Sequence, residues 1–269
     1  METAWLADHL KDPAIRIVEV DEDDQLYANG HIPGAVKLSW WKQLEHSVKR
    51  DVVSGADFAA VCAAAGIDPN TTVIFYGDKS NWFATYAYWL FKYNGFDQVK
   101  LLNGGRQKWI AENRGLTTDV PSYATTSPVV PGAPRESIRA LRDRILQAAG
   151  NIAFVDVRSP REYSGEIIAP EGYPQEGAQR GGHIPGAVNV PWAQCVREDG
   201  TFKDADALRA VYASQGVVPE REVIAYCRIG ERSSHTWFVL TELLGYPSAR
   251  NYDGSWTEYG NIVGAPIER

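Results

Sequence analysis

The sequence lacks any uninterrupted apolar run of about 18 residues, the length that a membrane-spanning helix needs. Its first nine residues contain acids where a secretory signal has bases, and they lack an apolar core. It also lacks a basic cluster, and its formal net charge is −7. A surface that follows the phosphates of a nucleic acid is therefore not expected, although a local cationic site is compatible with this charge. We expect a cytoplasmic protein that binds neither membranes nor nucleic acids.

Cysteine is scarce as well, with three residues in the chain: Cys62, Cys195 and Cys227. They cannot all pair with one another, and no two share the spacing of a zinc site, so we expect no bound metal. In a reducing compartment all three would be free thiols. Cys62 lies in an apolar helical stretch and Cys195 follows Pro191-Trp192, so core packing is the expected role of both, with a redox role as the alternative for Cys195.

Apolar residues make up 44% of the chain, which excludes a disordered or collagen-like protein. At roughly 150 residues per domain, the chain corresponds to about 1.8 domains, so two are expected. The hexapeptide His31–Val36 recurs unaltered as His183–Val188. In the same order, Ile17–Val20 corresponds to Val155–Val157, and a period of this length indicates a duplicated domain and not a short-repeat array.

Composition predicts where the two copies meet and where they differ. The second copy is longer by about 15 residues between Tyr163 and His183, in a Gly- and Pro-rich segment typical of an inserted surface loop. A seam rich in Pro, Ser and Thr predicts an extended linker between the copies. We therefore predict a first domain over residues 1–118, a linker over 119–135 and a second domain over 136–269.

Within the second copy, short β-branched runs alternate with amphipathic stretches. The expected elements are strands over 152–157, 187–190, 223–226 and 249–252, and helices over 208–215 and 234–244. Near-continuous apolar strands that alternate with helices predict a parallel sheet covered on both faces. Ligands of such sheets bind beyond the carboxyl ends of the strands, so the residues directly after Val157 and Tyr226 are the first candidates for a site.

Cys227 follows the strand that ends at Tyr226 and precedes a short loop and a helix. The helix N-terminus and the cations of Arg228 and Arg232 would favour the thiolate over the thiol. A cysteine can also simply fill space at the end of a strand, but the cationic loop and helix end favour a nucleophile here. We therefore expect Cys227 to be a nucleophile.

The loop after Cys227 has features of an anion site. Gly230 permits a positive φ, which lets successive amides point inward around an anion. Ser233 or Ser234 would cap the following helix. The loop would therefore hold an anion on the sulfur.

The first copy lacks these features. Gly77 and Asp78 stand where the second copy has Cys227 and Arg228, and Asp21 stands where it has Arg158. The thiol is lost, and acids replace two cations. We therefore expect the first copy to be non-catalytic.

Three motifs of the chain resemble those of the tandem-domain rhodaneses, the thiosulfate sulfurtransferases. They are Tyr27–Leu38, Cys227–Ser233 and Tyr252–Tyr259, which together span most of the sequence. The resemblance implies an α/β fold of two tandem rhodanese-like domains, each a parallel five-stranded sheet flanked by helices. It also implies a non-catalytic first domain and a catalytic second one.

The resemblance further implies a reaction. Cys227 would attack the outer sulfur of thiosulfate, sulfite would leave, and the sulfur would stay as a persulfide until cyanide, a small thiol or a protein acceptor removes it. The amides of the loop would stabilise the anionic sulfur, and its two arginines would hold the sulfonate. The expected substrate-binding residues of this loop are Arg228, Ile229, Gly230, Glu231, Arg232 and Ser233. No metal or organic cofactor is needed.

Asp156 and Arg158 match an Asp-x-Arg motif of the family. Asp156 is expected to support the loop or an arginine, and Arg158 to line the pocket or to pair internally, a purely structural ion pair being equally compatible. Two positions depart from the best-known animal thiosulfate enzymes: Ile229 replaces a lysine, and Glu162 replaces a substrate-binding arginine. Arg232, which those enzymes lack, would compensate for the lost positive charge.

Three other functions compete with thiosulfate sulfur transfer. The first is transfer from 3-mercaptopyruvate, whose enzymes typically carry small uncharged residues after the cysteine, unlike Arg228 and Arg232. The second is a cysteine phosphatase, which needs Cys-x5-Arg where this chain has Cys-x4-Arg. The third is a persulfide carrier that hands sulfur to another protein, for which the same loop would serve. Thiosulfate is the donor that the two arginines favour.

Overall fold

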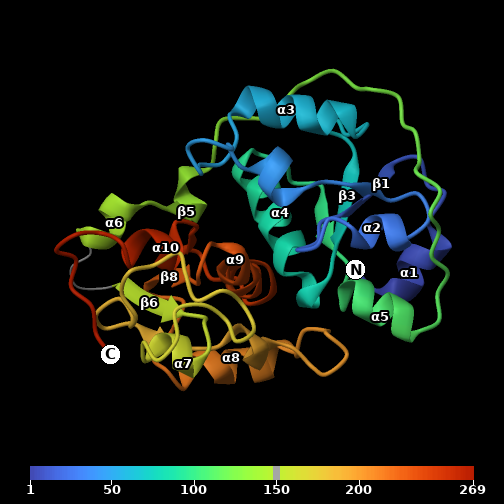
Figure 1. The fold of residues 1–269 in the computed structure, drawn as a ribbon. Coiled ribbons are helices and arrows are strands. Elements are labelled where there is room, and N and C mark those ends of the chain that lie inside the picture. The colour runs from blue at the N-terminus through green and yellow to red at the C-terminus, as the bar shows by residue number, and fades with distance from the viewer. Residues whose placement is uncertain (148–151) are drawn as a thin grey trace. The chain divides into compact units, whose positions relative to one another are not determined.

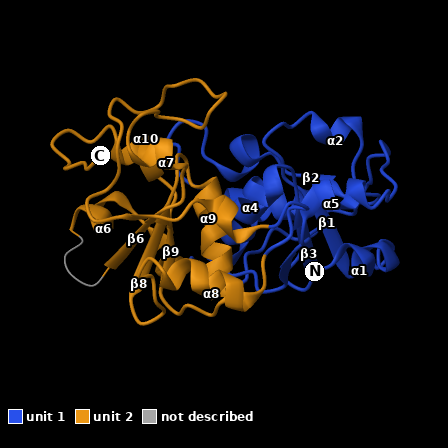
Figure 2. Cartoon of the chain, turned by 90° about the horizontal axis from the view of Figure 1, so that it is seen from below, with its two compact units in different colours: residues 1–135, 197–202 blue, residues 136–196, 203–269 orange. Residues whose placement is uncertain are grey.

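The structure is a computed structural model that describes residues 1–147 and 152–269. The chain divides into two compact units, coloured separately in Figure 2. Unit 1 comprises Met1–Arg135 and Arg197–Phe202, and unit 2 comprises Glu136–Val196 and Lys203–Arg269. Each unit contains one sheet whose strands are all parallel (Figure 1). The assignment of residues 119–135 as a linker stays a prediction.

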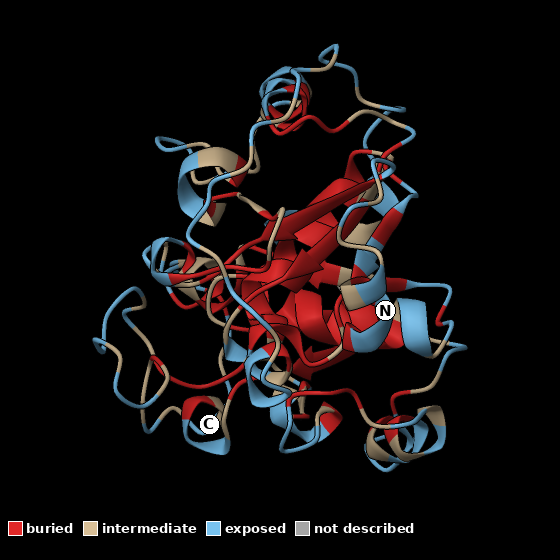
Figure 3. Ribbon diagram, turned by 90° about the vertical axis from the view of Figure 1, so that its right-hand side faces the viewer, coloured by how far each residue is buried: buried red, intermediate tan, exposed pale blue. Residues whose placement is uncertain are grey.

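Unit 2 contains a five-stranded sheet in the order β5-β9-β8-β6-β7, as expected. Its strands are β5 (Arg139–Ala140), β6 (Ile152–Asp156), β7 (Val188–Asn189), β8 (Glu222–Tyr226) and β9 (Ala249–Tyr252). Its α-helices are α6 (Arg142–Leu146), α7 (Pro160–Tyr163), α8 (Ala205–Ala213), α9 (Glu231–Phe238) and α10 (Ser255–Tyr259). A 3-10 turn covers Trp192–Cys195, and a π-helical turn, Val239–Leu243, continues α9. The central strands β6 and β8 are buried apart from their first residues, as expected of parallel strands covered on both faces. In Figure 3, which colours the chain by burial, the strands at the centre of the view are red.

Unit 1 contains a four-stranded sheet in the order β2-β1-β3-β4. Its strands are β1 (Ile15–Glu19), β2 (Val36–Lys37), β3 (Thr72–Tyr76) and β4 (Val99–Leu101), and its α-helices are α1 (Thr3–Asp8), α2 (Leu26–Asn29), α3 (Gly55–Ala64), α4 (Trp82–Tyr93) and α5 (Gly105–Ala111). The expectation of five strands is wrong for this unit. Beside β4, Met1 donates to the Leu101 carbonyl at 2.9 Å and accepts from the Asn103 amide at 2.8 Å. Met1 thus forms the hydrogen bonds that a residue of a fifth parallel strand would form beside β4. A single residue with these bonds does not make a strand.

Strand pairing confirms the duplication residue by residue. Glu19 lies opposite Tyr76 in unit 1, and Asp156 lies opposite Tyr226 in unit 2. The strands therefore end at equivalent points in both sheets. The residue after Tyr226 is the candidate nucleophile, Cys227, and its equivalent after Tyr76 is Gly77.

In each unit, one buried arginine bridges the carboxylate at the end of a central strand and a glycine carbonyl. In unit 1, Arg106 from α5 donates to Glu19 at 2.6 Å and to the Gly30 carbonyl at 2.5 Å. In unit 2, Arg158 donates to Asp156 at 2.5 Å and to the Gly182 carbonyl at 2.7 Å. The same internal bridge is thus built from two different positions of the repeat.

Candidate active site

The sulfur of Cys227 lies among hydrogen-bonding groups at the carboxyl end of β8. Its Sγ accepts from the Gly230 amide at 3.1 Å and from the Ser233 hydroxyl at 3.6 Å, and the Ser255 hydroxyl lies 4.0 Å away. The thiol donates to Glu231 Oε2 at 3.2 Å. Cys227 itself is completely buried. These donors could hold a negative charge on the sulfur or on an atom attached to it.

Gly230 allows the loop to turn back over the sulfur. Its φ is +108°, a conformation that side chains rarely adopt, and an added Cβ would lie 2.9 Å from the Asp253 Cα. Helix α9 begins directly after it, at Glu231, so the expected helix start at Ser234 is three residues late. The expectation of a serine cap is also wrong, because Gly230 is the N-cap and Ser233 and Ser234 lie inside the first turns.

Ser255 is a site residue to which the sequence analysis assigned no role. Its hydroxyl accepts from the Cys227 amide at 3.0 Å and donates to the Tyr252 carbonyl at 2.6 Å. Its φ is +51°, which is unusual outside glycine, and its equivalent in unit 1 is Gly105 with a φ of +54°. Because β9 lies next to β8, the residues after Tyr252 meet the same sheet edge as Cys227. The strand order therefore could have identified Ser255.

The environment of Cys227 does not favour its thiolate in the way that the sequence suggested. Burial raises the pKa of this thiol, and the Glu231 carboxylate raises it further. Arg232 and the hydrogen bonds from Ser233 act in the opposite direction without reversing the shift. The expected lowering of the pKa is therefore wrong for the resting site. The prediction considered the cations of the loop but not the carboxylate of Glu231, which contacts the sulfur.

Arg232 is engaged by a carboxylate from another helix. Its guanidinium donates two parallel hydrogen bonds to Glu162 on α7, each of 3.0 Å, and both side chains are buried. Although burial alone would raise the pKa of Glu162, Arg232 holds it below its ordinary value. Glu162, one of the two departures from the family pattern, thus forms an ion pair with Arg232, which the best-known animal enzymes lack. Arg232 does not present the unpaired charge that a substrate-binding role would need.

Arg158 also pairs internally. It is completely buried, its Nε donates to both Asp156 carboxylate oxygens at 2.9 and 3.1 Å, and its Cζ lies 4.5 Å from the Trp256 ring centroid. A pocket-lining role for this guanidinium is therefore wrong. Asp156 supports the arginine, as the second of the two interpretations expected.

Arg228 is the remaining cation of the loop. It is half-buried, and within residues 1–147 and 152–269 its guanidinium forms no ion pair, while its Nε has no hydrogen-bond partner. An added Cβ on Gly177 would lie 3.7 Å from Arg228 Nη2, so the inserted loop of unit 2 reaches this side chain. Ile229 lies beside it, also half-buried. Arg228 is thus the arginine that is best placed to meet an anion.

The equivalent turn in unit 1 is closed to this chemistry. An added Cβ on Gly77 would lie 2.1 Å from the Val20 carbonyl oxygen, so no side chain fits there without a backbone shift. The Asn81 side chain accepts from the Gly77 amide at 3.0 Å and occupies the turn. Unit 1 therefore lacks both the thiol and the space for one.

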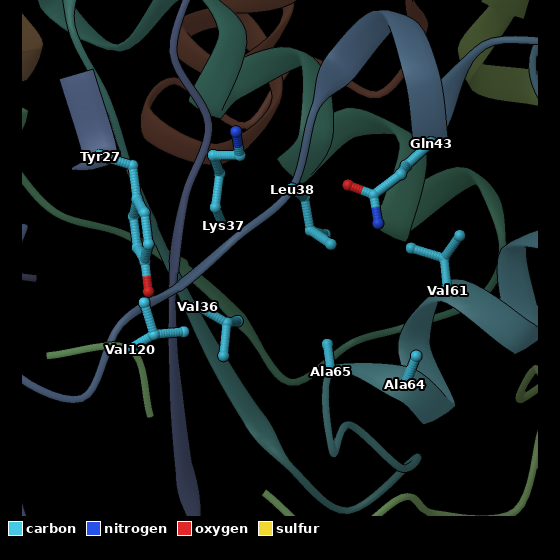
Figure 4. Close-up of a pocket in the computed structure, with 9 residues that line it drawn as sticks. All are labelled: Tyr27, Val36, Lys37, Leu38, Gln43, Val61, Ala64, Ala65 and Val120. Carbon is cyan, nitrogen blue, oxygen red and sulfur yellow. The ribbon is translucent and has the colours of Figure 1, made fainter. Parts of the chain in front are cut away.

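The other candidate groups lie elsewhere. Cys62 and Cys195 are buried free thiols, and burial raises their pKa values to about 12 and about 11. A cavity of about 340 Å³ in unit 1 has mostly aliphatic walls, with Lys37 and Gln43 as its nitrogen-bearing side chains (Figure 4). Across the described residues, no cluster of His, Cys, Asp or Glu could hold a metal ion, and no helix is long and apolar enough to cross a membrane.

The model of the rhodanese-like domain matches the chain twice, over residues 2–112 and 139–261. The chain belongs to the rhodanese-like family. Two curated relatives cover all of it: the "Sulfur carrier protein TtuD" of Thermus thermophilus is 54% identical over 96% of its own length, and a "Putative thiosulfate sulfurtransferase" of Saccharopolyspora erythraea is 52% identical over 95%.

Solved structures agree with this assignment. SseA of Escherichia coli, described as a 3-mercaptopyruvate sulfotransferase with the rhodanese fold, matches with a TM-score of 0.81 and 26% identity. The match covers 95% of this chain and 98% of SseA. Sulfur transfer or carriage is the activity that these relatives are named for.

Proposed function

We propose that the chain is a thiosulfate sulfurtransferase that carries sulfur as a persulfide on Cys227. The observation that carries the proposal is the Sγ of Cys227, held 3.1 Å from the Gly230 amide, with the hydroxyl oxygens of Ser233 and Ser255 at 3.6 and 4.0 Å. A covalently attached, anionic sulfur would find the amide in place as a donor, with two hydroxyl groups beside it.

The reaction has two displacement steps. In the first, the Cys227 sulfur forms a bond to the outer sulfur of thiosulfate, and the bond between that sulfur and the sulfonate sulfur breaks, its electron pair leaving with sulfite. In the second, cyanide or a thiolate attacks the outer sulfur of the persulfide, and the electron pair returns to Cys227. No net oxidation occurs, so neither step requires a redox cofactor.

The pairing of the arginines changes their proposed roles. Arg228 would hold the sulfonate end of the donor, because it is the loop cation without an ion-pair partner among the described residues. Arg232 and Arg158 would support the site through Glu162 and Asp156. Among the described residues, the loop thus offers one cation without an ion-pair partner to a dianionic donor, where the sequence suggested two.

A persulfide carrier is the second candidate function. The 54% identity to TtuD, named a sulfur carrier protein, favours it, and the chemistry at Cys227 would be the same up to the last step. The acceptor would then be a nucleophile on another protein, such as a thiol, and not cyanide. Transfer from 3-mercaptopyruvate, suggested by the name of SseA, differs only in the donor.

Intact-mass measurement after incubation with thiosulfate tests the nucleophile. The wild-type protein should gain one sulfur atom and lose it on addition of cyanide, with release of thiocyanate. Cys227→Ser should gain none. Cys195→Ser is the matched control, because Cys195 is equally buried in the same unit and hydrogen-bonds Tyr212 at 3.2 Å, and it should gain sulfur as the wild type does.

The donor and reaction class are tested by parallel assays with thiosulfate, 3-mercaptopyruvate and a phosphate monoester. Thiosulfate should give the highest kcat/KM and the phosphate monoester none. A protein that gains no sulfur from thiosulfate is not a thiosulfate sulfurtransferase. If it gains sulfur from 3-mercaptopyruvate alone, the donor is misassigned while the role of Cys227 stands.

A further inference from the structure

Glu231 is the nearest base to the candidate nucleophile. Its Oε2 lies 3.2 Å from Cys227 Sγ, with the thiol as the donor. The hydroxyls near the sulfur have other acceptors: Ser233 donates to Asn251 Oδ1 at 2.6 Å, and Ser255 donates to the Tyr252 carbonyl at 2.6 Å. Among the groups around the sulfur, the Glu231 carboxylate is therefore the one suited to accept the thiol proton.

The charges around Glu231 also favour Glu231 as the proton acceptor. Arg232 Nε lies 3.4 Å from Glu231 Oε1, but this guanidinium already donates two hydrogen bonds to Glu162. One cation is thus shared by two buried carboxylates, which leaves an excess of one negative charge. Glu162 keeps its charge because its two hydrogen bonds are with the guanidinium, so Glu231 is the carboxylate that is better placed to take up a proton.

We propose that Glu231 is a catalytic residue that receives the Cys227 proton when sulfur is loaded and returns it when sulfur leaves. This inference rests on the proposed sulfurtransferase function. During loading, the thiol proton moves to the Glu231 carboxylate, Sγ bonds to the outer sulfur of thiosulfate, and sulfite leaves with the electron pair of the broken bond. When cyanide removes the outer sulfur as thiocyanate, the Cys227 thiolate takes the proton back from Glu231.

This proton transfer keeps the charge of the site constant. At rest, Cys227 is neutral and Glu231 is negative; in the loaded state, the persulfide is negative and Glu231 is neutral. Thiosulfate and cyanide become sulfite and thiocyanate without a proton entering or leaving the site. An ionised Glu231 beside an anionic persulfide would instead place two negative charges within hydrogen-bond distance, in a buried site where their repulsion is strong.

Burial lowers the pKa of His235 on α9 to about 3, so this histidine would not imitate the effect between pH 6 and pH 9. The other charged groups packed against the loop are arginines and carboxylates. They are Arg228 in the loop, Arg232 with Glu162 from α7, Arg158 with Asp156 after β6, and Arg139 with Asp253 after β9, whose closest nitrogen and oxygen are 3.0 Å apart. Arginines stay protonated throughout this range. The pH dependence of Cys227 reactivity therefore reports on Glu231.

The test compares the wild type with Glu231→Gln, which keeps the shape of the side chain but not its basicity. The control is Glu171→Gln, which removes the same charge from an exposed position of unit 2. Single-turnover persulfide formation with thiosulfate and alkylation of Cys227 by iodoacetamide are both measured from pH 6 to pH 9. The wild type and the control should show rates that are nearly independent of pH. Glu231→Gln should be about 100-fold slower at pH 7 and gain about tenfold per pH unit.

If Glu231 acted on Cys227 only through its negative charge, the opposite result would be expected. The carboxylate raises the pKa of the Cys227 thiol, so its neutralisation would then speed alkylation and loading across the whole range. Faster reaction of Glu231→Gln would overturn the proposal. If the wild type is not loaded by thiosulfate but alkylation follows the expected profiles, the sulfurtransferase assignment fails and the proton pair stands.

A measurement on the wild-type protein keeps the proposal testable if the variant does not fold. Infrared difference spectra on loading with thiosulfate should show the carbonyl stretch of a newly protonated carboxyl group, and addition of cyanide should reverse it. Glu171→Gln should show the same band. A loaded protein, verified by its intact mass, that shows no such band would refute the transfer of the proton to Glu231.

Discussion

The buried ion pair between Glu162 and Arg232 should contribute strongly to the stability of unit 2. Both side chains are buried, and the guanidinium and carboxylate share two hydrogen bonds of 3.0 Å. Glu162→Gln leaves a guanidinium in the interior without its counter-ion, which typically costs about 3–5 kcal/mol. The amide oxygen of Gln can keep one hydrogen bond, so we expect about 3 kcal/mol. At a urea slope of about 2 kcal/mol per M, the unfolding midpoint should fall by about 1.5 M.

Pulsed alkylation in urea, mapped by mass spectrometry, can follow each unit separately. Cys195 is buried in unit 2, and Cys62 is buried in unit 1, so the second thiol is an internal control in the same molecule. Glu162→Gln should lower the midpoint for Cys195 and leave that for Cys62 unchanged. The double variant Glu162→Met with Arg232→Met should lose less stability than the single one, because it buries no charge. A midpoint shift below about 0.5 M, or additive losses in the double variant, would refute the reasoning.

The same pair predicts a dependence on pH with a defined sign. The pKa of Glu162 is lowered in the folded state, so its contribution to stability is present above the pKa of the unfolded carboxyl, about 4.3. It is lost as the pH falls through the folded value. The difference in stability between the wild type and Glu162→Gln should therefore be constant near neutral pH and should narrow below about pH 4.

Two glycines give the remaining predictions. Gly230→Ala forces a side chain into a φ of +108° and places its Cβ 2.9 Å from the Asp253 Cα. Urea unfolding should show a loss of about 1–3 kcal/mol in stability, and intact mass should show that most persulfide formation is lost. A stable variant that is fully loaded with sulfur would contradict the role of the turn. Gly77→Cys should not create a second sulfur site, because its Cβ would lie 2.1 Å from the Val20 carbonyl oxygen. Intact mass after thiosulfate should show one added sulfur, and two would show that unit 1 can be activated.

The place of the candidate site at the carboxyl end of a strand can be predicted from the sequence, for reasons that are local. Strand β8 is a short apolar run, and an apolar run that precedes a glycine-containing turn and a helix predicts a strand-to-helix connection. The identical hexapeptides at His31 and His183 predicted the duplication, and the strand registers confirm it. These features depend on residues that are close in the chain or repeated unaltered.

Partners that are distant in the chain could not be predicted in this way. Arg232 and Glu162 are 70 positions apart, so a count of charges in the loop assigned Arg232 to the substrate. Every residue of α9 from Glu231 to Phe238 is buried, although its first six residues are polar or charged and typical of an exposed surface. Buried polar groups need partners, and Arg232 has one on α7 while Ser233 has one on β9. The electrostatics of Cys227 therefore depended on packing that the sequence does not display.

The two units also show why a duplicated domain cannot be interpreted position by position. Asp21 stands at the position of Arg158, which suggested that unit 1 had lost a cation at this strand end. The cation is present, but Arg106 supplies it from α5 and makes the same two contacts, to a strand-end carboxylate and to a glycine carbonyl. Its own equivalent in unit 2 is Trp256, whose ring lies over Arg158. A bridge that both copies keep by different residues serves the fold, which leaves Cys227, Arg228 and Glu231 as the features that separate the copy with the candidate site from the other.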